Sequence, residues 1–346
     1  MKDGKLLYLP NKGTELIRTI SEAQKSRQLL TIERKETGDD EFDVYVLSRS
    51  ADLLLGAFIN DFNFDGYFII KTDGITMAKP FSRLYTLICN EETDPRKIAA
   101  PDIDLTSWMS ALSFAAFKTN IISVEGYHYG EEYRLYGLVS ELKESSFMFS
   151  SFDLNGEWDA DYELSFDEIT SIFFYSRYER RWQKYLSEHR IYGAVSDSDC
   201  DYYTHLLKLF NTIDNEQMNY NWLISDCECL SGDINVRETF SSKSFVSGSE
   251  LTDLIRTDDF QWIWGVLSGF KKDIPQEEIL AYPTPLSERT GHCGSYPSIS
   301  HPLAEIEITA FDSSMMYFYT RDRILFERFV KGYPKCRIMD QPIFDA

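Results

Sequence analysis

The sequence is poor in the residues that build metal centres and disulfide frameworks. Its 346 residues include six cysteines and five histidines. Only Cys227 and Cys229 are closely spaced, with one residue between them, whereas structural zinc sites usually use two cysteine pairs with about two to four intervening residues. Residues two apart on a strand point to one face, so we interpret this pair as facing the core. We expect no metal and no cofactor.

Long apolar runs are also missing. No stretch approaches the roughly 18 apolar residues that span a membrane, and the apolar stretch within residues 1–10 is too short for a secretory signal. Sparse cysteines without such a signal are expected to remain reduced thiols. The sequence therefore predicts a cytoplasmic protein that makes no membrane contact.

The common phosphate-binding and metalloprotease motifs, Gly-x-Gly-x-x-Gly, Gly-x-x-x-x-Gly-Lys-Ser/Thr and His-Glu-x-x-His, do not occur. His292 and Cys293 lie in a polar loop, with His301 downstream. A cysteine nucleophile needs a histidine and an orienting group placed beside it in space, which adjacency in the sequence does not provide. We therefore interpret residues 283–302 as a mobile connector. An enzyme of unrecognised type is kept as a hypothesis that ranks third, after the two binding functions given at the end of this subsection.

Positive charge is scarce relative to negative charge. Lys and Arg number 35 and Asp and Glu number 56, which gives a net charge of −21. A duplex-binding protein needs a cationic surface to displace counterions, so we predict no nucleic-acid binding. A basic protein would instead be attracted and steered toward this surface. The alternative is that the acidity only maintains solubility.

The negative charge is unevenly distributed along the chain. Residues 1–100 carry 14 basic and 16 acidic side chains, net −2. Residues 101–190 carry 8 and 16, net −8, and residues 191–346 carry 13 and 24, net −11. We therefore expect any dedicated acidic binding face to lie after residue 100.

Apolar and aromatic side chains are abundant. They make up 43% and 15% of the sequence. Disordered chains are poor in aromatic residues, so most of this chain is expected to fold. At roughly 150 residues per domain, the length accommodates about two to three domains.

An internal repeat occupies the first half of the chain. Residues 65–76 are repeated in residues 159–170 at an offset of 94, and residues 31–33 match 123–125 at an offset of 92. Because an ordered series of matches is harder to produce by chance than a single match, we predict a true duplication. The three anchors of the first match are Asp65 with Asp159, Asp73 with Asp167, and Ile75 with Ile169.

Each copy of the repeat has the pattern of short strands separated by turns. Residues 36–40 and 129–132 are typical of hairpin turns, and residues 62–66 and 152–156 are rich in Asn, Asp and Gly, which tolerate positive φ. Several short strands within about 65 residues favour a small, strongly curved barrel. Helical spacing predicts helices over residues 12–28, 106–118 and 178–186.

The motifs of the two copies resemble those of a known family. Asp65-Gly66-Tyr67 with Asp73, and residues 166–169 with 176–179, are similar to an uncharacterised family of Gram-positive bacteria that has an Asp-Gly-Tyr strand, an Asp-Ile strand and a closing Tyr-Glu helix. The second copy departs at Asp159-Ala160-Asp161, where Gly-Tyr is missing. The resemblance implies a small β-rich domain and no known activity.

The region after residue 191 has the pattern of an α+β domain. Ser247 precedes Glu250 by three residues, a capping pattern that indicates the start of a helix. The predicted elements are a helix over 202–212, strands over 220–224 and 260–267, a helix after 247, a hairpin over 304–320 and a helix over 323–330.

Three of these segments carry a second resemblance. The strand at 220–224, the strand at 262–267 and the hairpin around Asp312-Ser313 are similar to another uncharacterised bacterial family, across roughly residues 191–340. The resemblance implies an α+β domain and no chemistry. Related small acidic proteins often occur beside bacterial toxin genes as antidotes.

The densest uncompensated charge lies in the second copy of the repeat, where residues 153–168 contain no Lys or Arg. Alternating oxygen ligands there do not complete a calcium loop, which leaves a solvated strand face or an acidic face that binds protein. The residues chosen as the candidate binding site are Asp153, Glu157, Asp159, Asp161 and Glu163.

We therefore predict an α+β fold in which two tandem small β-barrel-like domains with flanking helices, residues 1–100 and 101–190, precede an α+β domain, residues 191–346. The predicted function is non-enzymatic binding of a basic protein, as an inhibitor or immunity-type protein that occludes its partner. The alternative is a scaffold or adaptor that recognises peptides at sheet edges. The sequence does not determine the oligomeric state.

Overall fold

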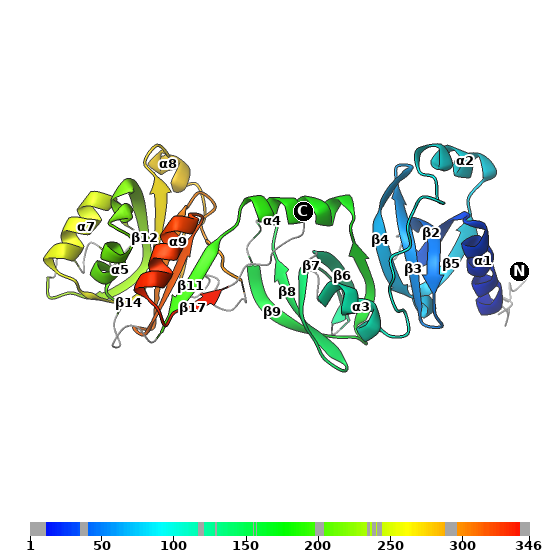
Figure 1. Ribbon diagram of the computed structural model, residues 1–346, viewed down its shortest axis with the longest axis horizontal. Helices are drawn as coiled ribbons and strands as arrows, with labels where there is room; N and C mark the ends of the chain where they lie inside the picture. The colour runs from blue at the N-terminus through cyan, green and yellow to red at the C-terminus, as the bar shows by residue number, and fades with distance from the viewer. Residues whose placement is uncertain are drawn as a thin grey trace, which may run out of the picture. The chain divides into compact units, whose positions relative to one another are not determined.

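The computed structural model has a mixed α+β fold of helices and strands, as predicted (Figure 1). It groups into two compact units. Unit 1 comprises the described residues within Met1–Phe149 and Glu163–Lys184, and unit 2 those within Ser150–Tyr162 and Tyr185–Ile343. The structure describes residues 12–34, 41–116, 121–128, 130–154, 156, 158–197, 204–233, 236, 240, 244–287 and 296–339.

The first half of the chain contains one arrangement twice, a helix followed by five strands and a second helix. The first copy consists of α1 (Lys12–Ser26), β1 (Leu29–Arg34), β2 (Glu41–Arg49), β3 (Leu53–Asn60), β4 (Asn63–Lys71), β5 (Ile75–Pro80) and α2 (Arg83–Glu92). The second copy consists of α3 (Trp108–Ala116), β6 (Ile122–His128), β7 (Glu131–Leu142), β8 (Ser146–Phe152), β9 (Trp158–Ser165), β10 (Ile169–Phe174) and α4 (Arg177–Glu188).

Both copies have the same strand order. The first four strands follow one another across the sheet, and the fifth returns to pair antiparallel with the first, as β5 does with β1 and β10 with β6. The fifth strands begin at Ile75 and Ile169, and the closing helices begin at Arg83 and Arg177. Both pairs are 94 residues apart, which is the offset of the sequence repeat.

The two copies join in one sheet. The strand order is β5-β1-β2-β3-β4-β10-β6-β7-β8-β9, in which β4 pairs antiparallel with β10 and Phe68 lies opposite Phe173. The predicted barrel-like tandem domains are not confirmed, because β4 pairs with the second copy instead of closing onto β5. The predicted boundary at residue 100 falls between α2 and α3.

Apolar side chains cover both faces of the sheet in the first copy. On one face, Ile20 and Ala23 of α1 pack onto the strands. On the other face, Trp108 and Leu112 of α3 pack into a cluster that includes strand residues of both copies. Strands that are buried on two sides read as continuous apolar runs, which explains the segment Leu53–Leu55.

The turn between β3 and β4 differs from the prediction. Asn60 pairs with Asn63, so the turn consists of Asp61 and Phe62, whose φ angles are 48° and 66°. Two central residues with positive φ are typical of the type I′ turn that fits the twist of a hairpin. The prediction of a turn over residues 62–66 was therefore wrong, because Asn63 already begins β4.

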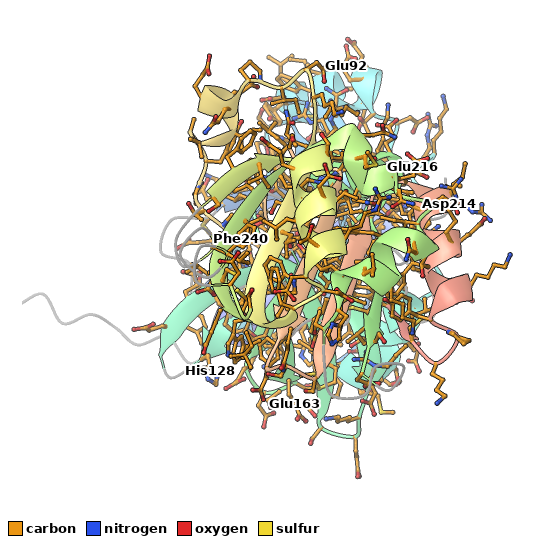
Figure 2. The ribbon with its side chains drawn as sticks, turned by 90° about the vertical axis from the view of Figure 1, so that its left-hand side faces the viewer. Glu92, His128, Glu163, Asp214, Glu216 and Phe240 are labelled. Atoms are coloured by element: carbon orange, nitrogen blue, oxygen red, sulfur yellow. The ribbon has the colours of Figure 1, made fainter. Side chains whose placement is uncertain are left out.

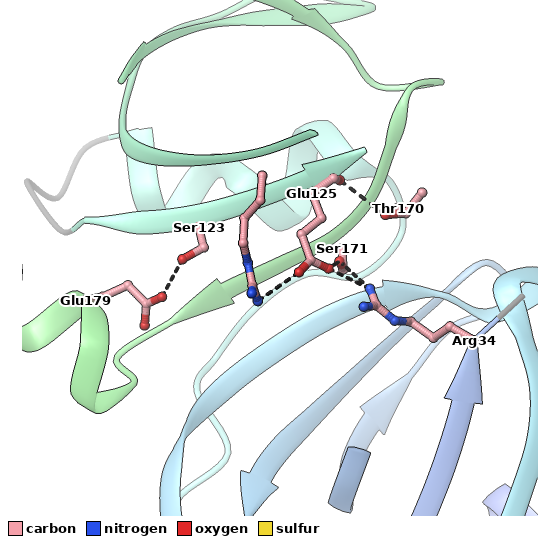
Figure 3. A network of polar contacts seen from close by, with 7 residues as sticks. Arg34, Ser123, Glu125, Thr170, Ser171 and Glu179 are labelled. Carbon is pink, nitrogen blue, oxygen red and sulfur yellow. Dashed lines mark hydrogen bonds and ion pairs between the residues drawn. The ribbon is translucent and has the colours of Figure 1, made fainter. Parts of the chain in front are cut away.

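A buried ion-pair network lies beside the junction of the two copies (Figure 3). Arg34 of β1 donates to Glu125 Oε2 of β6 at 2.6 Å and to Ser171 Oγ of β10 at 2.7 Å. Arg134 of β7 reaches Glu125 Oε1 at 2.8 Å. The side chains of Arg34 and Glu125 are 4% and 6% exposed, whereas that of Arg134 is 49% exposed. The pairing of Arg34 with Glu125 therefore links the first copy to the second away from solvent.

Unit 2 is built on a second antiparallel sheet with the order β13-β12-β14-β15-β16-β11-β17. Its strands are β11 (Tyr192–Ser196), β12 (Tyr220–Leu230), β13 (Ser244–Ser247), β14 (Gln261–Lys271), β15 (Ile306–Phe311), β16 (Met315–Thr320) and β17 (Arg337–Met339). Its helices are α5 (Leu206–Thr212), α7 (Gly248–Thr257), α8 (Gln276–Ile279) and α9 (Arg323–Gly332).

The two faces of this sheet are covered differently. Helices α5, α7 and α9 pack on one face, with Leu209, Ile255 and Phe329 in a shared cluster. The other face is covered by α8 and by the segment before β15. The predicted start of α7 is confirmed, because Ser247 and Glu250 form the reciprocal bonds of a capping box. The predicted hairpin of β15 and β16 is also confirmed.

Replacement of Glu125 by Gln should destabilise unit 1, because it leaves the buried Arg34 guanidinium without its compensating charge. Breaking a buried ion pair by removing one partner costs about 3 kcal/mol or more. We expect a loss of this size in the free energy of unfolding, measured by urea denaturation.

Glu33 provides the matched control. It is the residue of the first copy that matches Glu125 at an offset of 92, it is half-buried, and within the described residues it forms no ion pair. Glu33→Gln should change stability by less than about 1 kcal/mol. Equal losses for the two variants would show that the ion pair does not hold the copies together.

Candidate binding site

Three of the five predicted site residues lie on one strand. Asp159, Asp161 and Glu163 alternate along β9, so strand geometry directs their side chains to one face. Asp153 is half-buried and follows the end of β8. Glu157 lies outside the described residues. The structure therefore brings together the part of the predicted site that lies on β9.

Each of the three β9 acids accepts a hydrogen bond from a serine of β8. The serines are buried, and their hydroxyl groups hold the three carboxylates in fixed positions. The bonds are Ser151 Oγ to Asp159 Oδ2 at 3.2 Å, Ser150 Oγ to Asp161 Oδ1 at 2.7 Å, and Ser146 Oγ to Glu163 Oε1 at 2.7 Å.

The environments of the acids shift two of their pKa values in opposite directions. Burial raises the pKa of Asp159, and the hydrogen bond from Ser151 opposes this rise. The hydroxyl of Ser146 lowers the pKa of Glu163, and Lys143, whose Nζ lies 3.1 Å from Glu163 Oε1, lowers it further. The ion pair is solvent-exposed and contributes little to stability.

Strand β9 is one edge of the ten-stranded sheet, and β5 is the other. The two edges differ in sequence. β5 ends in Lys79 and Pro80, and both residue types discourage the addition of a further strand. β9 contains no proline, and its charge is entirely negative. Of the two edges, β9 is the one on which a strand of positive charge could add.

Acidic residues elsewhere in unit 2 are partly engaged in ion pairs. Arg328 of α9 lies 3.2 Å from Asp214 and 3.4 Å from Glu216. Figure 2 labels both acids beside α9. Part of the large negative charge of residues 191–346 is therefore neutralised by ion pairs beside α9.

The residues considered for catalysis and metal binding have structural roles where they are described. His301 is fully buried, its Nε2 lies 3.0 Å from the carbonyl oxygen of Ile279, and its Nδ1 accepts from the backbone N–H of Leu303. Cys229 is buried in the core, and Cys227 packs against the same cluster. His292 and Cys293 lie outside the described residues. No group of three or more potential metal ligands occurs among the residues that the structure describes.

The structure also contains a cleft that was not predicted from the sequence. A cleft of about 390 Å³ in unit 2 is bordered by α4, by residues 282–286 and by residues 298–302. The interpretation of residues 283–302 as a mobile connector was wrong for the described parts, because Ser287, Ser298 and Ile299 are buried. The cleft lies between segments that are distant in sequence, so no local pattern indicated it.

Comparisons with known proteins do not identify the family. No family model matches the chain, and no curated protein is detectably similar to it. The two resemblances described above therefore stay predictions. None of the helices in the described part of the chain has the length and apolar character needed to span a membrane.

The two pKa shifts on β9 can be tested through the serines. Ser151→Ala should raise the pKa of Asp159 further, because it removes a hydrogen bond to the charged form. Ser146→Ala and Lys143→Met should each raise the pKa of Glu163, because each removes a group that stabilises its charged form. Carboxyl-detected NMR titration of the wild type and the three variants measures each value. Unchanged pKa values in the serine variants would contradict the described geometry.

Proposed function

We propose that the protein binds a basic segment of another protein along the edge strand β9. The acidic strand would cover a basic surface that its partner needs for its own activity. The chain would thus act as an inhibitor or immunity-type protein. No chemical step is required of any residue.

The observation that carries the proposal is the internal junction between the two copies. β4 and β9 occupy the same position in their copies, and β4 pairs antiparallel with β10. The chain itself thus contains one example of this edge accepting a further strand. At the same position in the second copy, β9 has β8 on one side and, among the described strands, no neighbour on the other.

The two equivalent strands differ where they would meet a partner. At the offset of 94, Tyr67 and Ile69 of β4 correspond to Asp161 and Glu163 of β9. In β4, Ile69 lies opposite Ile172 and Tyr67 lies opposite Phe174, both apolar partners. Cross-strand neighbours of opposite charge stabilise a pair of strands. The substitution of acids at these positions therefore favours a strand that carries Lys or Arg.

Addition of a strand to a sheet edge provides main-chain hydrogen bonds, and the side chains at alternate positions provide specificity. The net charge of −21 adds long-range attraction for a basic partner. A bare edge with charged residues also protects a sheet against unwanted pairing. If the acids of β9 have only this protective role, a basic strand should not bind, whereas the proposed binding role predicts that it does.

An extended peptide of alternating Lys and Val, labelled with a fluorophore, tests the proposal directly. Fluorescence anisotropy should show binding at about 50 mM NaCl and at least tenfold weaker binding at about 500 mM, because salt screens exposed charges. The triple variant Asp159→Asn, Asp161→Asn, Glu163→Gln should weaken binding at low salt by at least about tenfold.

A second triple variant, Asp52→Asn, Asp73→Asn, Glu92→Gln, removes the same number of charges from exposed positions of the first copy. It should bind the peptide nearly as the wild type does. Equal effects of the two triple variants would show that only bulk charge matters. Binding that is insensitive to salt would instead favour the adaptor hypothesis, in which the edge recognises peptides through the main chain alone.

A further inference from the structure

The cleft in unit 2 has a charge that is opposite to that of the protein. Among the residues that the structure describes, its lining includes Arg321 and His189 and no Asp or Glu. The chain as a whole has 56 acidic and 35 basic residues. A concave site lined by groups of one sign focuses the electrostatic potential and concentrates ligands of the opposite charge. The lining therefore selects against the cations that the rest of the surface attracts.

Arg321 is held in place by backbone groups. Its Nε donates to the carbonyl oxygen of Ala304 at 3.1 Å, and one terminal nitrogen donates to that of His189 at 3.5 Å. The neighbouring acid Glu305 is bonded to Lys271 at 2.8 Å. Within the described part of the chain, Arg321 forms no ion pair. A guanidinium has five N–H donors, so carbonyl groups fix its position while donors and the full positive charge remain for a ligand.

The imidazole ring of His189 is also held in position by neighbouring groups. Its Nδ1 lies 2.9 Å from the carbonyl oxygen of Tyr185, and its ring stacks on that of Tyr185 with 4.1 Å between centroids. Because a carbonyl oxygen can only accept, Nδ1 carries the proton. The remaining nitrogen, Nε2, can serve a ligand.

Most of the residues that line the cleft are apolar or aromatic, and hydrogen bonds to groups outside the cleft hold its walls in place. Pro285 is anchored by its carbonyl oxygen, which accepts from the buried Ser225 at 2.8 Å. Ser287 donates its backbone N–H to Asp226 at 2.8 Å, and its hydroxyl donates to the same carboxylate. On the opposite side, the fully buried Glu307 accepts from the hydroxyl of Ser300 at 3.1 Å. A cleft whose walls are held in this way loses little conformational entropy when a ligand binds.

The geometry points to a binding site for a small carboxylate that carries an aromatic or other flat apolar group. The carboxylate would pair with Arg321, in the planar two-point arrangement that guanidinium groups favour. The apolar group would lie among Tyr185, Tyr282 and the apolar wall residues. The volume of about 390 Å³ lies at the lower end of the range for small-molecule sites. This inference is independent of β9 and adds a second binding activity.

The same chemistry occurs in a free aromatic acid and at the C-terminus of a peptide that ends in an aromatic residue. Benzoate and N-acetyl-phenylalanine represent the two sources. Benzamide and N-acetyl-phenylalanine amide are matched neutral probes, and benzamidine is a cation of the same shape.

The experiment is NMR titration of the full chain, labelled at Ile and Leu methyl groups, with these five probes. At least one carboxylate should bind and shift the methyl resonances of Leu186, Ile191 and Ile299, which line the cleft. The methyl resonances of Ile69 in unit 1 serve as the internal control and should not shift. The neutral probe matched to that carboxylate should bind at least tenfold more weakly, and benzamidine should not bind.

Arg321→Gln should weaken carboxylate binding at least tenfold, and Lys272→Gln, at an exposed site outside the lining, should leave it unchanged. If the Arg321 variant is poorly folded, the comparison of charged and neutral probes on the wild type decides alone. Stronger binding of benzoate than of N-acetyl-phenylalanine identifies a free acid, and the reverse order a peptide terminus. Equal binding of carboxylate and neutral probes, shifts confined to other methyl groups, or no binding of any carboxylate would overturn the inference.

Discussion

The pairing of β4 with β10 is the interaction on which the rest of unit 1 depends. It converts two five-stranded copies into one sheet and so decides which strands become edges. Polar contacts reinforce it at several points: Arg34 meets Glu125 in the buried network, Lys71 donates to the carbonyl oxygen of Asp167, and Asp65 accepts from the backbone N–H of Arg177. A buried ion pair adds little net stability, so we interpret the network as a device that fixes the register in which the copies meet.

This constraint has a consequence for function. When two copies join through the fourth strand of one and the fifth strand of the other, one fourth strand and one fifth strand remain at the edges of the sheet. The strand equivalent to β10 is β5, and it ends in Lys79 and Pro80. The strand equivalent to β4 is β9, and it carries Asp159, Asp161 and Glu163. Under the proposed function, the repeat provides an interaction surface without new architecture, since the strand position that is paired internally in the first copy is an edge of the sheet in the second. The cleft of unit 2 is a separate site with the opposite preference for charge.

Elements whose signals are local could be predicted from the sequence. α1 has a single apolar stripe, and α7 has the capping pair Ser247 and Glu250. The alternating strand β15 is followed by a tight turn and the apolar strand β16. Helix α2 was missed because it has no single stripe: Cys89 is buried, whereas Leu84 and Leu87 are exposed on the same helix.

Features that depend on distant residues could not be predicted. The pairing of β4 with β10 joins residues about a hundred positions apart, and no local pattern states which of two similar edges will be covered. The alternating acids of β9 were found as a cluster, but the serines of β8 that hold them, and the position of β9 at the sheet edge, required the fold. The cleft depends on the packing of residues 185–191, 282–286 and 298–302 with Gly156 and Arg321, which are distant in the sequence.

Hydrogen–deuterium exchange of the full chain, with and without the alternating Lys-Val peptide, tests the central claim most directly. Amide groups on the outward side of an edge strand exchange quickly, and they become protected when a further strand pairs with them. The account predicts slower exchange in residues 158–165 of β9 when the peptide is bound, and no change in β5. Unchanged exchange in β9 at a peptide concentration that saturates binding would contradict it.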